Sequence, residues 1–233
     1  MKNPAAGGGR WIEIQPDRFP SWMLEFGRRH GGAAGLADDG QGAVFTARAA
    51  DGAIAECHPP FPPLVITARS GTPEAIVAHA LADRTVGVLL ARLGGYAVGV
   101  FAGAPPRLVA SKTGSRLVHG RSAAGGWSQH RFARRREKQA SEALRAAADA
   151  AVAVFKDARL DAVVLGGDRR AIAGLAGDPR LTDYLAGATD RFLTVPDPRL
   201  AVLRDTPRAF LAIRIRLIEP APVEPGPEET ESP

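Results

Sequence analysis

A chain of 233 residues is long enough to bury a core without disulfides or metals, and its single cysteine, Cys57, excludes an intramolecular disulfide. No apolar run approaches the roughly 20 residues that a membrane span needs, so we expect a cytoplasmic protein without a membrane partner. The net charge of +5 is uneven: residues 107–145 hold ten Lys or Arg and two acids, a net +8, which leaves −3 elsewhere. One concentrated basic patch favours a polyanion such as nucleic acid.

The N-terminal part of the chain predicts a small α/β unit. Residues 1–9 end in three glycines, and we expect them to form a disordered lead. Hydrophobic periodicity and the turn signal Asp51-Gly52 predict the elements that follow. These are a strand over 11–15, a helix over 19–29, and a hairpin of strands 44–48 and 53–57. The Pro-rich run 58–63 fits neither a helix nor a central strand, so we place the end of this unit, residues 10–63, there.

The main domain is predicted over residues 64–218. Its elements are a helix over 73–82, a hairpin of strands 85–93 and 96–101, a strand or strand pair over 107–113 and 116–121 with a turn at Gly114, a polar loop over 122–127, a helix over 128–156, a strand over 162–165, a helix over 169–175, and strands over 192–195 and 210–217. Hairpins, a long helix and then strand–helix alternation predict a mixed sheet with helices packed on it, which is an α/β domain. Residues 219–233 hold five Glu, five Pro and no Lys or Arg, so we expect a disordered tail.

The helix predicted from Ser128 has a basic face. Spacing of i, i+3, i+4 and i+7 places five cations on much of one side, away from an apolar stripe: Arg131, Arg134, Arg135, Lys138 and Arg145. Glu137 and Glu142 are nearly the only carboxylates placed to pair with them. Such a face is either a solvated surface or a contact for phosphates, and the adjoining Gly-rich loop favours the phosphate contact.

Gly125 and Gly126 lie just ahead of this helix. A Gly pair alone is typical of a turn, but beside a reactive side chain it lets the backbone approach a substrate closely. Gln129 is that side chain, because a carboxamide can hydrogen-bond a water and a developing oxyanion together. Ester hydrolysis of this kind requires neither a metal nor a cofactor, and the five histidines and Cys57 show no metal-binding spacing. Alternatively, backbone N–H groups of the loop do most of the work and Gln129 caps the helix.

One pattern resembles the Gly-Gly-Gln loop and following helix of archaeal and eukaryotic class-1 peptide-chain release factors: Gly125-Gly126-x-Ser128-x-x-Arg131-Phe132-x-Arg134-x-Arg136. The similarity extends upstream to His119-Gly120-Arg121 and downstream through residues 163–167, and it covers about residues 85–217. It is closer still to the Vms-like release factor (VLRF) family, in its actinobacterial branch. This resemblance implies an RNase H-like mixed sheet of the release-factor middle-domain type. It also implies hydrolysis of the peptidyl-tRNA ester on stalled large ribosomal subunits.

The resemblance also implies roles for individual residues. The release factors have Gln directly after the Gly pair, where this chain has Trp127, but VLRF members are similar in displacing that Gln. Gln129 is therefore the expected catalytic residue, together with Gly125 and Gly126. The residues expected to contact RNA are Arg121, Trp127, His130, Arg131, Arg134, Arg135 and Lys138.

The implied partners are peptidyl-tRNA and the large ribosomal subunit with its rRNA, and not DNA. Only about 60 residues precede the main domain, with no evident room for a decoding domain, so we expect ribosome rescue rather than stop-codon termination. Two alternatives stay open. One is a nuclease that trims the tRNA end, and the other is a non-catalytic module that binds the ribosome or RNA.

Overall fold

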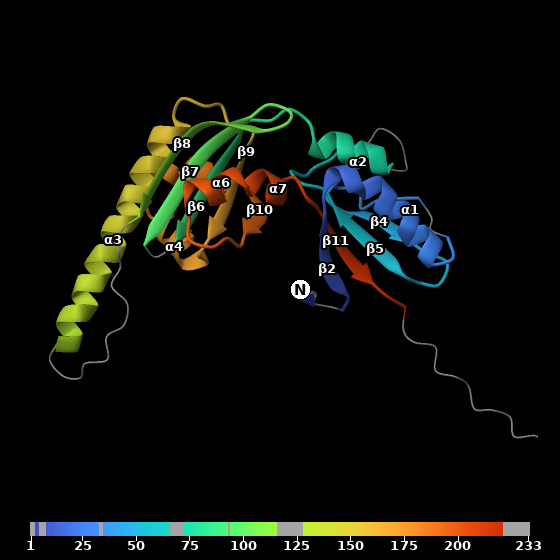
Figure 1. Ribbon diagram of the computed structural model, residues 1–233, viewed down its shortest axis with the longest axis horizontal. Coiled ribbons are helices and arrows are strands. Elements are labelled where there is room, and N and C mark those ends of the chain that lie inside the picture. Colours follow the sequence, from blue (N-terminus) through green and yellow to red (C-terminus); the bar gives the residue numbers. More distant parts are fainter. Residues whose placement is uncertain are drawn as a thin grey trace, which may run out of the picture. The chain divides into compact units, whose positions relative to one another are not determined.

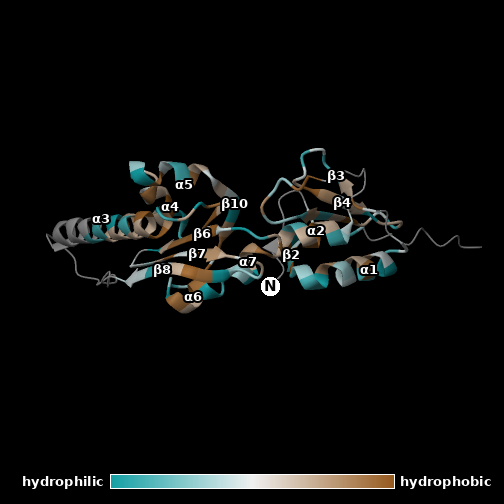
Figure 2. Cartoon of the chain, turned by 90° about the horizontal axis from the view of Figure 1, so that it is seen from above, coloured by the Kyte–Doolittle hydropathy of each residue, from teal (hydrophilic) through white to brown (hydrophobic). Residues whose placement is uncertain are grey.

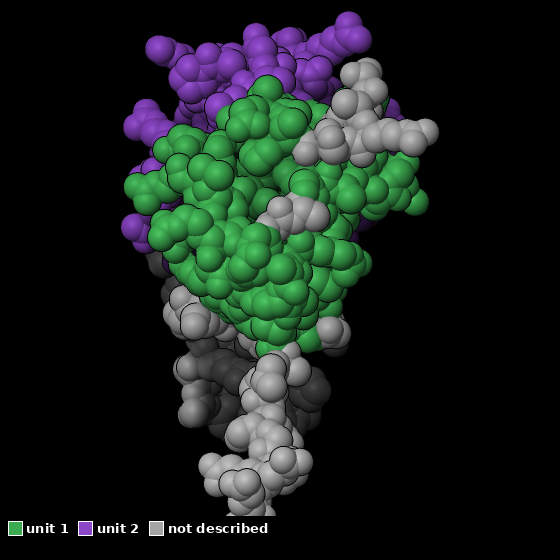
Figure 3. All heavy atoms as spheres, turned by 90° about the vertical axis from the view of Figure 1, so that its right-hand side faces the viewer, with its two compact units in different colours: residues 1–80, 212–233 green, residues 81–211 purple. Residues whose placement is uncertain are grey.

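The computed structural model describes residues 3–4, 8–32, 35–65, 72–92, 94–115 and 128–220, with the backbone only for residues 3–4 and 128–138. The chain divides into two compact units (Figure 3). Unit 1 comprises residues 1–80 and 212–233, and unit 2 comprises residues 81–211. Unit 2 is therefore inserted into the chain of unit 1.

Unit 1 is built on a six-stranded antiparallel sheet. Its strand order is β1 (Asn3–Pro4), β2 (Arg10–Ile14), β11 (Ile213–Ile218), β5 (Ile54–His58), β4 (Phe45–Arg48) and β3 (Ala37–Asp38). In β11, Ile215 lies opposite Ile12 of β2 on one side and Cys57 of β5 on the other. The last strand in the sequence thus occupies the middle of this sheet.

Helices cover one face of this sheet (Figure 1). They are α1 (Phe19–Arg29), which follows the short helix η1 (Pro16–Arg18), and α2 (Pro73–Ala80). The helix α1 buries Phe19, Met23 and Phe26, whose spacing of four and then three residues puts them on one side. They pack with alternate residues of β11, including Ile213 and Ile215, in a single core.

Unit 2 contains a five-stranded mixed sheet. Its order is β10 (Ala188–Leu193), β9 (Ala162–Gly167), β6 (Val86–Arg92), β7 (Gly95–Ala102) and β8 (Arg107–Ser115). The strands β6, β7 and β8 form an antiparallel meander, whereas β9 runs parallel to β6 and β10 parallel to β9. Figure 2 shows that the hydrophobic residues concentrate in the central strands. The strand β6 buries six of its seven residues, and the edge strand β8 buries none.

Helices lie on both faces of this sheet (Figures 1 and 2). One face carries α3 (Ser128–Phe155), α4 (Arg169–Leu175), η2 (Pro179–Leu181) and α5 (Thr182–Ala186), and the other carries α6 (Leu200–Arg204) and α7 (Thr206–Phe210). Val98 of β7 shares a core with Ala151 and Phe155 of α3. On the opposite face, the ring centroid of Phe101 lies 5.7 Å from that of Phe210.

The predicted fold class is confirmed, since the chain is an α/β protein whose larger unit has a mixed sheet with packed helices. The division of the chain differs from the prediction. Residues 64–80 and 212–218 belong to unit 1 rather than to the main domain. The reason is that α2 packs in the core of unit 1 and β11 pairs between β2 and β5. In the predicted disordered lead, Asn3 and Pro4 pair with β2.

Two local predictions are wrong, and others fall outside the described residues. The strand β8 continues through Gly114, where a turn was expected. Glycine fits there for a packing reason, because the Tyr96 ring of the paired strand occupies the space that a side chain at position 114 would need. Phe210 ends α7 rather than starting a strand, and β11 begins at Ile213. The predicted strand 116–121, the loop 122–127 and the tail beyond Pro220 lie outside the described residues.

Candidate functional site

The candidate site lies at the N-terminal end of α3, where the predicted loop meets the predicted basic helix. The helix has 28 residues, about 42 Å at 1.5 Å per residue. Figure 1 shows its N-terminal half extending beyond the end of β8, while its C-terminal half lies beside the sheet. The first turns of α3 therefore project from the core of unit 2.

Buried alanines anchor the C-terminal half of α3. Ala147, Ala148, Ala150 and Ala151 are buried, and Phe155 has no exposed surface. Ala147, Ala151 and Phe155 repeat every four residues and belong to the predicted apolar stripe. Since alanine side chains are short, the helix can approach β7 and β8 closely. Contacts along one half of the helix thus support the half that projects.

The predicted site residues fall into two groups. The backbone of α3 carries six of them in its first turns, namely Gln129, His130, Arg131, Arg134, Arg135 and Lys138, whose side chains are outside the described part of the structure. Four others lie within residues 116–127, also outside it: Arg121, Gly125, Gly126 and Trp127. The helix start at Ser128 matches the prediction. The geometry of the loop and of the Gln129 side chain stays a prediction.

Arg145 is the one member of the predicted basic face whose side chain is described. It is exposed, and no carboxylate among the described side chains forms an ion pair with it. It lines a groove of about 660 Å³ between α3 and the segment that leads to η2. Leu144, Ala148 and Leu175 give this groove apolar walls, and Ser141 lies beside Arg145 on the α3 side.

A charged cluster braces the wall of this groove. The guanidinium of Arg180 donates to both carboxylate oxygens of Asp178, with Nε–Oδ1 and Nη2–Oδ2 distances of 3.0 and 2.7 Å. The same Nη2 donates to Oδ1 of Asp149 on α3 at 2.8 Å. Hydrogen bonds from the Arg180 side chain and backbone lower the pKa of Asp178 to about 2. Arg180 therefore ties η2 to the helix that carries the candidate site.

Sequence reasoning missed this cluster. Asp178 followed by Pro179 is a local signal for a helix start, and the Asp178 side chain does cap η2 by accepting from the backbone N–H of Arg180. Nothing local links Arg180 to Asp149, which lies 31 residues earlier. Only the packing of η2 against α3 brings the two charges together.

The described residues offer no metal site, because no three His, Cys, Asp or Glu side chains among them gather closely enough to hold an ion. Cys57 is fully buried, and burial raises the pKa of its thiol to about 12, so it is a poor nucleophile. None of the helices in the described part of the chain is both long and apolar enough to span a bilayer.

Comparison with known proteins gives this architecture a class. A family model described as the Actinobacteria/chloroflexi VLRF1 release factor matches residues 84–216, which is more than half of the chain. The matched segment contains β6–β10 and the helix α3 that carries the candidate site, so the class is that of release factors. Within it, the chain belongs to the Actinobacteria/chloroflexi VLRF1 release factor family. No curated protein matches the sequence.

The solved structures with weak similarity to the chain include three archaeal proteins. An archaeal protein has 12% identity and a TM-score of 0.36, with 69% of this chain and 48% of that chain covered. The archaeal translation termination factor aRF1 has 11% identity and a TM-score of 0.36, with 83% and 61% covered. Pelota from Archaeoglobus fulgidus has 9% identity and a TM-score of 0.29, with 91% and 66% covered. The chain spans about half to two thirds of the length of these structures.

Proposed function

We propose that this protein is a peptidyl-tRNA hydrolase that releases the nascent peptide from tRNA on stalled large ribosomal subunits. The observation that carries the proposal is the position of Gln129 in the first turn of a projecting helix, three residues after Gly126 in the sequence. Membership of a release factor family supports a role in translation termination or ribosome rescue. The basic positions that follow along the helix supply the RNA contacts that such a role needs.

In the proposed reaction, water attacks the carbonyl carbon of the ester that joins the peptide to the tRNA. A new C–O bond forms as the ester C–O bond breaks, the peptide leaves as a carboxylic acid, and the tRNA oxygen takes a proton that the water gives up. The carboxamide oxygen of Gln129 accepts a hydrogen bond from the water, and its NH2 group donates to the developing oxyanion. The positive end of the α3 dipole adds to this stabilisation.

The helix positions the enzyme on RNA. Arg131, Arg134, Arg135 and Lys138 contact phosphates, a contact that fixes position without reading sequence. Arg121 and His130 extend this surface, and Trp127 stacks on a base. Such binding weakens as salt rises, because phosphate contacts release counterions. Gly125 and Gly126 let the loop backbone come close to the ester.

The decisive experiment incubates large ribosomal subunits bearing peptidyl-tRNA with the wild-type protein and with Gln129→Ala. A gel that resolves both products should show free peptide and intact tRNA with the wild type. Loss of one preorganised group of this kind lowers the rate by about 10²–10³-fold, and that is the expected effect of Gln129→Ala. Gln139→Ala removes the same side chain further along α3 and should leave the rate unchanged.

Three outcomes would count against the proposal in different ways. If peptidyl-tRNA stays intact with the wild-type protein, the protein is a non-catalytic module that binds the ribosome or RNA. A shortened tRNA would identify a nuclease that trims the tRNA end. Equal rates for the wild type and Gln129→Ala would move catalysis from the carboxamide to the backbone N–H groups of the loop.

A further inference from the structure

Acidic residues are missing from a long stretch of this chain. Residues 84–136 contain ten Lys or Arg and no Asp or Glu, although the whole chain has 25 acids. The strands β6 and β7 belong to this stretch and bury most of their residues, so the cost of burying a charge explains the absence there. Burial cannot explain it in β8, where seven of nine residues are exposed and none is buried.

In the sheet of unit 1, the cations on β11 lie beside carboxylates. Arg216 of β11 lies opposite Glu56 in the sheet and pairs with it at 3.1 Å. Arg214 lies opposite Glu13, with 4.0 Å between Nε and Oε1. In β8 the two cations, Arg107 and Lys112, form no ion pair with any described residue. Within the described part of the chain, their charge is therefore not balanced by a neighbouring carboxylate.

The strand β8 also has the polar groups that contact phosphates. It is the outermost strand of its sheet, and no described strand pairs with its outer edge, so backbone N–H groups face outward there. The exposed hydroxyls of Ser111, Thr113 and Ser115 alternate with Lys112 along the strand, so they lie on the opposite face of the sheet from Lys112. Backbone N–H, hydroxyl, Lys and Arg groups are the usual donors to phosphate oxygens.

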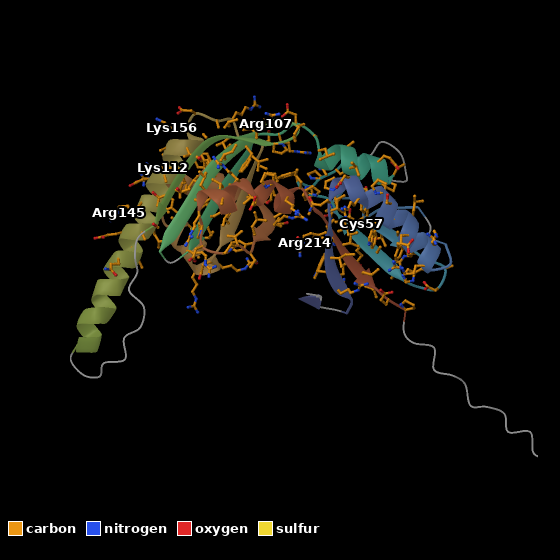
Figure 4. All side chains as sticks on the ribbon, in the orientation of Figure 1. Cys57, Arg107, Lys112, Arg145, Lys156 and Arg214 are labelled. Atoms are coloured by element: carbon orange, nitrogen blue, oxygen red, sulfur yellow. The ribbon has the colours of Figure 1, made fainter. Side chains whose placement is uncertain are left out.

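The position of β8 connects it to the candidate site. Lys112 lies opposite Val98 of β7, whose side chain packs in the core with α3, so Lys112 is on the α3 face of the sheet. Figure 4 shows Lys112 beside α3 and Arg107 toward the other end of β8. The two positions are about 17 Å apart along the strand. From Ser115 the chain leads through residues 116–127 directly to α3.

We propose that β8 is a second RNA-contact element, along which an RNA strand runs with its phosphates on Arg107, Lys112 and the outward-facing backbone N–H groups. This inference rests on the proposed function, because it assumes that RNA binds at α3 and adds that the same RNA also contacts β8 of unit 2. An extended peptide could instead add to the same edge. The lack of any acid in residues 84–136, and two cations that form no ion pair with a described carboxylate, favour a polyanion.

The test measures binding of deacylated tRNA as a function of salt. This probe has no ester, so the result does not depend on whether Gln129 catalyses hydrolysis. Removal of one phosphate-binding cation should lower the slope of log affinity against log salt by about one, and the affinity by about fivefold at about 0.15 M salt. We expect these shifts for Lys112→Gln and for Arg107→Gln, and larger decreases for the two reversals to Glu.

Arg48→Glu is the matched control, because Arg48 is an exposed cation on a strand of unit 1. It should leave both slope and affinity at the wild-type values, and circular dichroism should show all variants folded. If the β8 variants bind tRNA as Arg48→Glu does, the proposal is overturned. The cations of β8 would then serve only to keep the edge from pairing with other strands.

Discussion

Arg180 links two segments that are distant in the sequence by forming ion pairs with both. It pairs with Asp178 in its own turn and with Asp149 on α3. All three side chains are at least partly exposed, so salt screens the cluster and its contribution to overall stability is small. Its effect is local, because it fixes η2 against the helix that carries the candidate site.

The Asp178–Arg180 pair should make stability depend on pH in acid. The pKa of Asp178 falls from 3.8 to about 2 because hydrogen bonds from Arg180 favour the carboxylate. Folding therefore gains stability from this group above pH 3.8 and loses it as pH falls toward about 2. Asp178→Asn cannot ionise, so its unfolding midpoint in urea should fall less than that of the wild type over this pH window. Asp205→Asn, an exposed control away from the cluster, should follow the wild type, and a parallel response of Asp178→Asn would contradict the prediction.

The buried residues in the C-terminal half of α3 are mostly alanines, which let the helix pack closely on the sheet. Ala147, Ala148, Ala150 and Ala151 face the sheet or its neighbours, and larger residues in their place would push the helix outward. The same segment has Ala153 on its exposed side. The distance between the helix and the sheet therefore depends on side-chain size on the buried face alone. The direction in which the N-terminal half of α3 projects depends on the same contacts.

A larger side chain at Ala151 should destabilise unit 2. Ala151 has no exposed surface, so Ala151→Leu adds volume to a filled core and should cost about 1–3 kcal/mol of unfolding free energy. Ala153→Leu makes the same change on the exposed side and should stay within about 0.5 kcal/mol of the wild type. Denaturant unfolding followed by circular dichroism measures both. Equal effects of the two substitutions would show that the core beside Ala151 has room.

The elements of this fold were predictable where their signals are local. The Gly pair before Ser128 and the apolar period after it mark α3, and Asp51-Gly52 marks the hairpin of β4 and β5. The turn expected at Gly114 fails because glycine there serves packing under Tyr96, a contact from a neighbouring strand. The basic positions of the candidate site stay a prediction from spacing, whereas the Arg180 cluster depends on tertiary packing, which no local pattern indicates.

At the scale of the whole molecule, the inserted arrangement of the units was not predictable from local patterns. The strand β11 reads as an ordinary alternating strand, and nothing in its residues tells which sheet it joins. Its partners, β2 and β5, lie at the other end of the sequence. Local patterns predict that a strand pairs with strands near it in the sequence. The sequence therefore suggests that β11 belongs to the sheet of the larger domain. In the structure, β11 instead pairs with two strands that are distant in the sequence, because its apolar residues pack in the core of unit 1.

This arrangement makes unit 1 dependent on the C-terminal strand. Deleting residues 212–233 removes β11 from between β2 and β5 and takes Ile213, Ile215 and Leu217 out of the core. Unit 1 should then unfold and expose Cys57, whose thiol is buried in the intact protein and has a pKa raised to about 12. Unit 2 has its own core and should keep its helical circular dichroism signal.

Thiol labelling of Cys57 measures this directly, because reaction requires an accessible thiolate. The truncated protein should react rapidly under native conditions, while the full chain should react only when it unfolds. Deleting residues 221–233 alone leaves β11 in place and is the matched control, which should remain protected. Protection of Cys57 in the longer deletion would mean that β2 and β5 hold the core without the strand between them. Equal loss of the helical signal and of protection would mean that the two units fold as one.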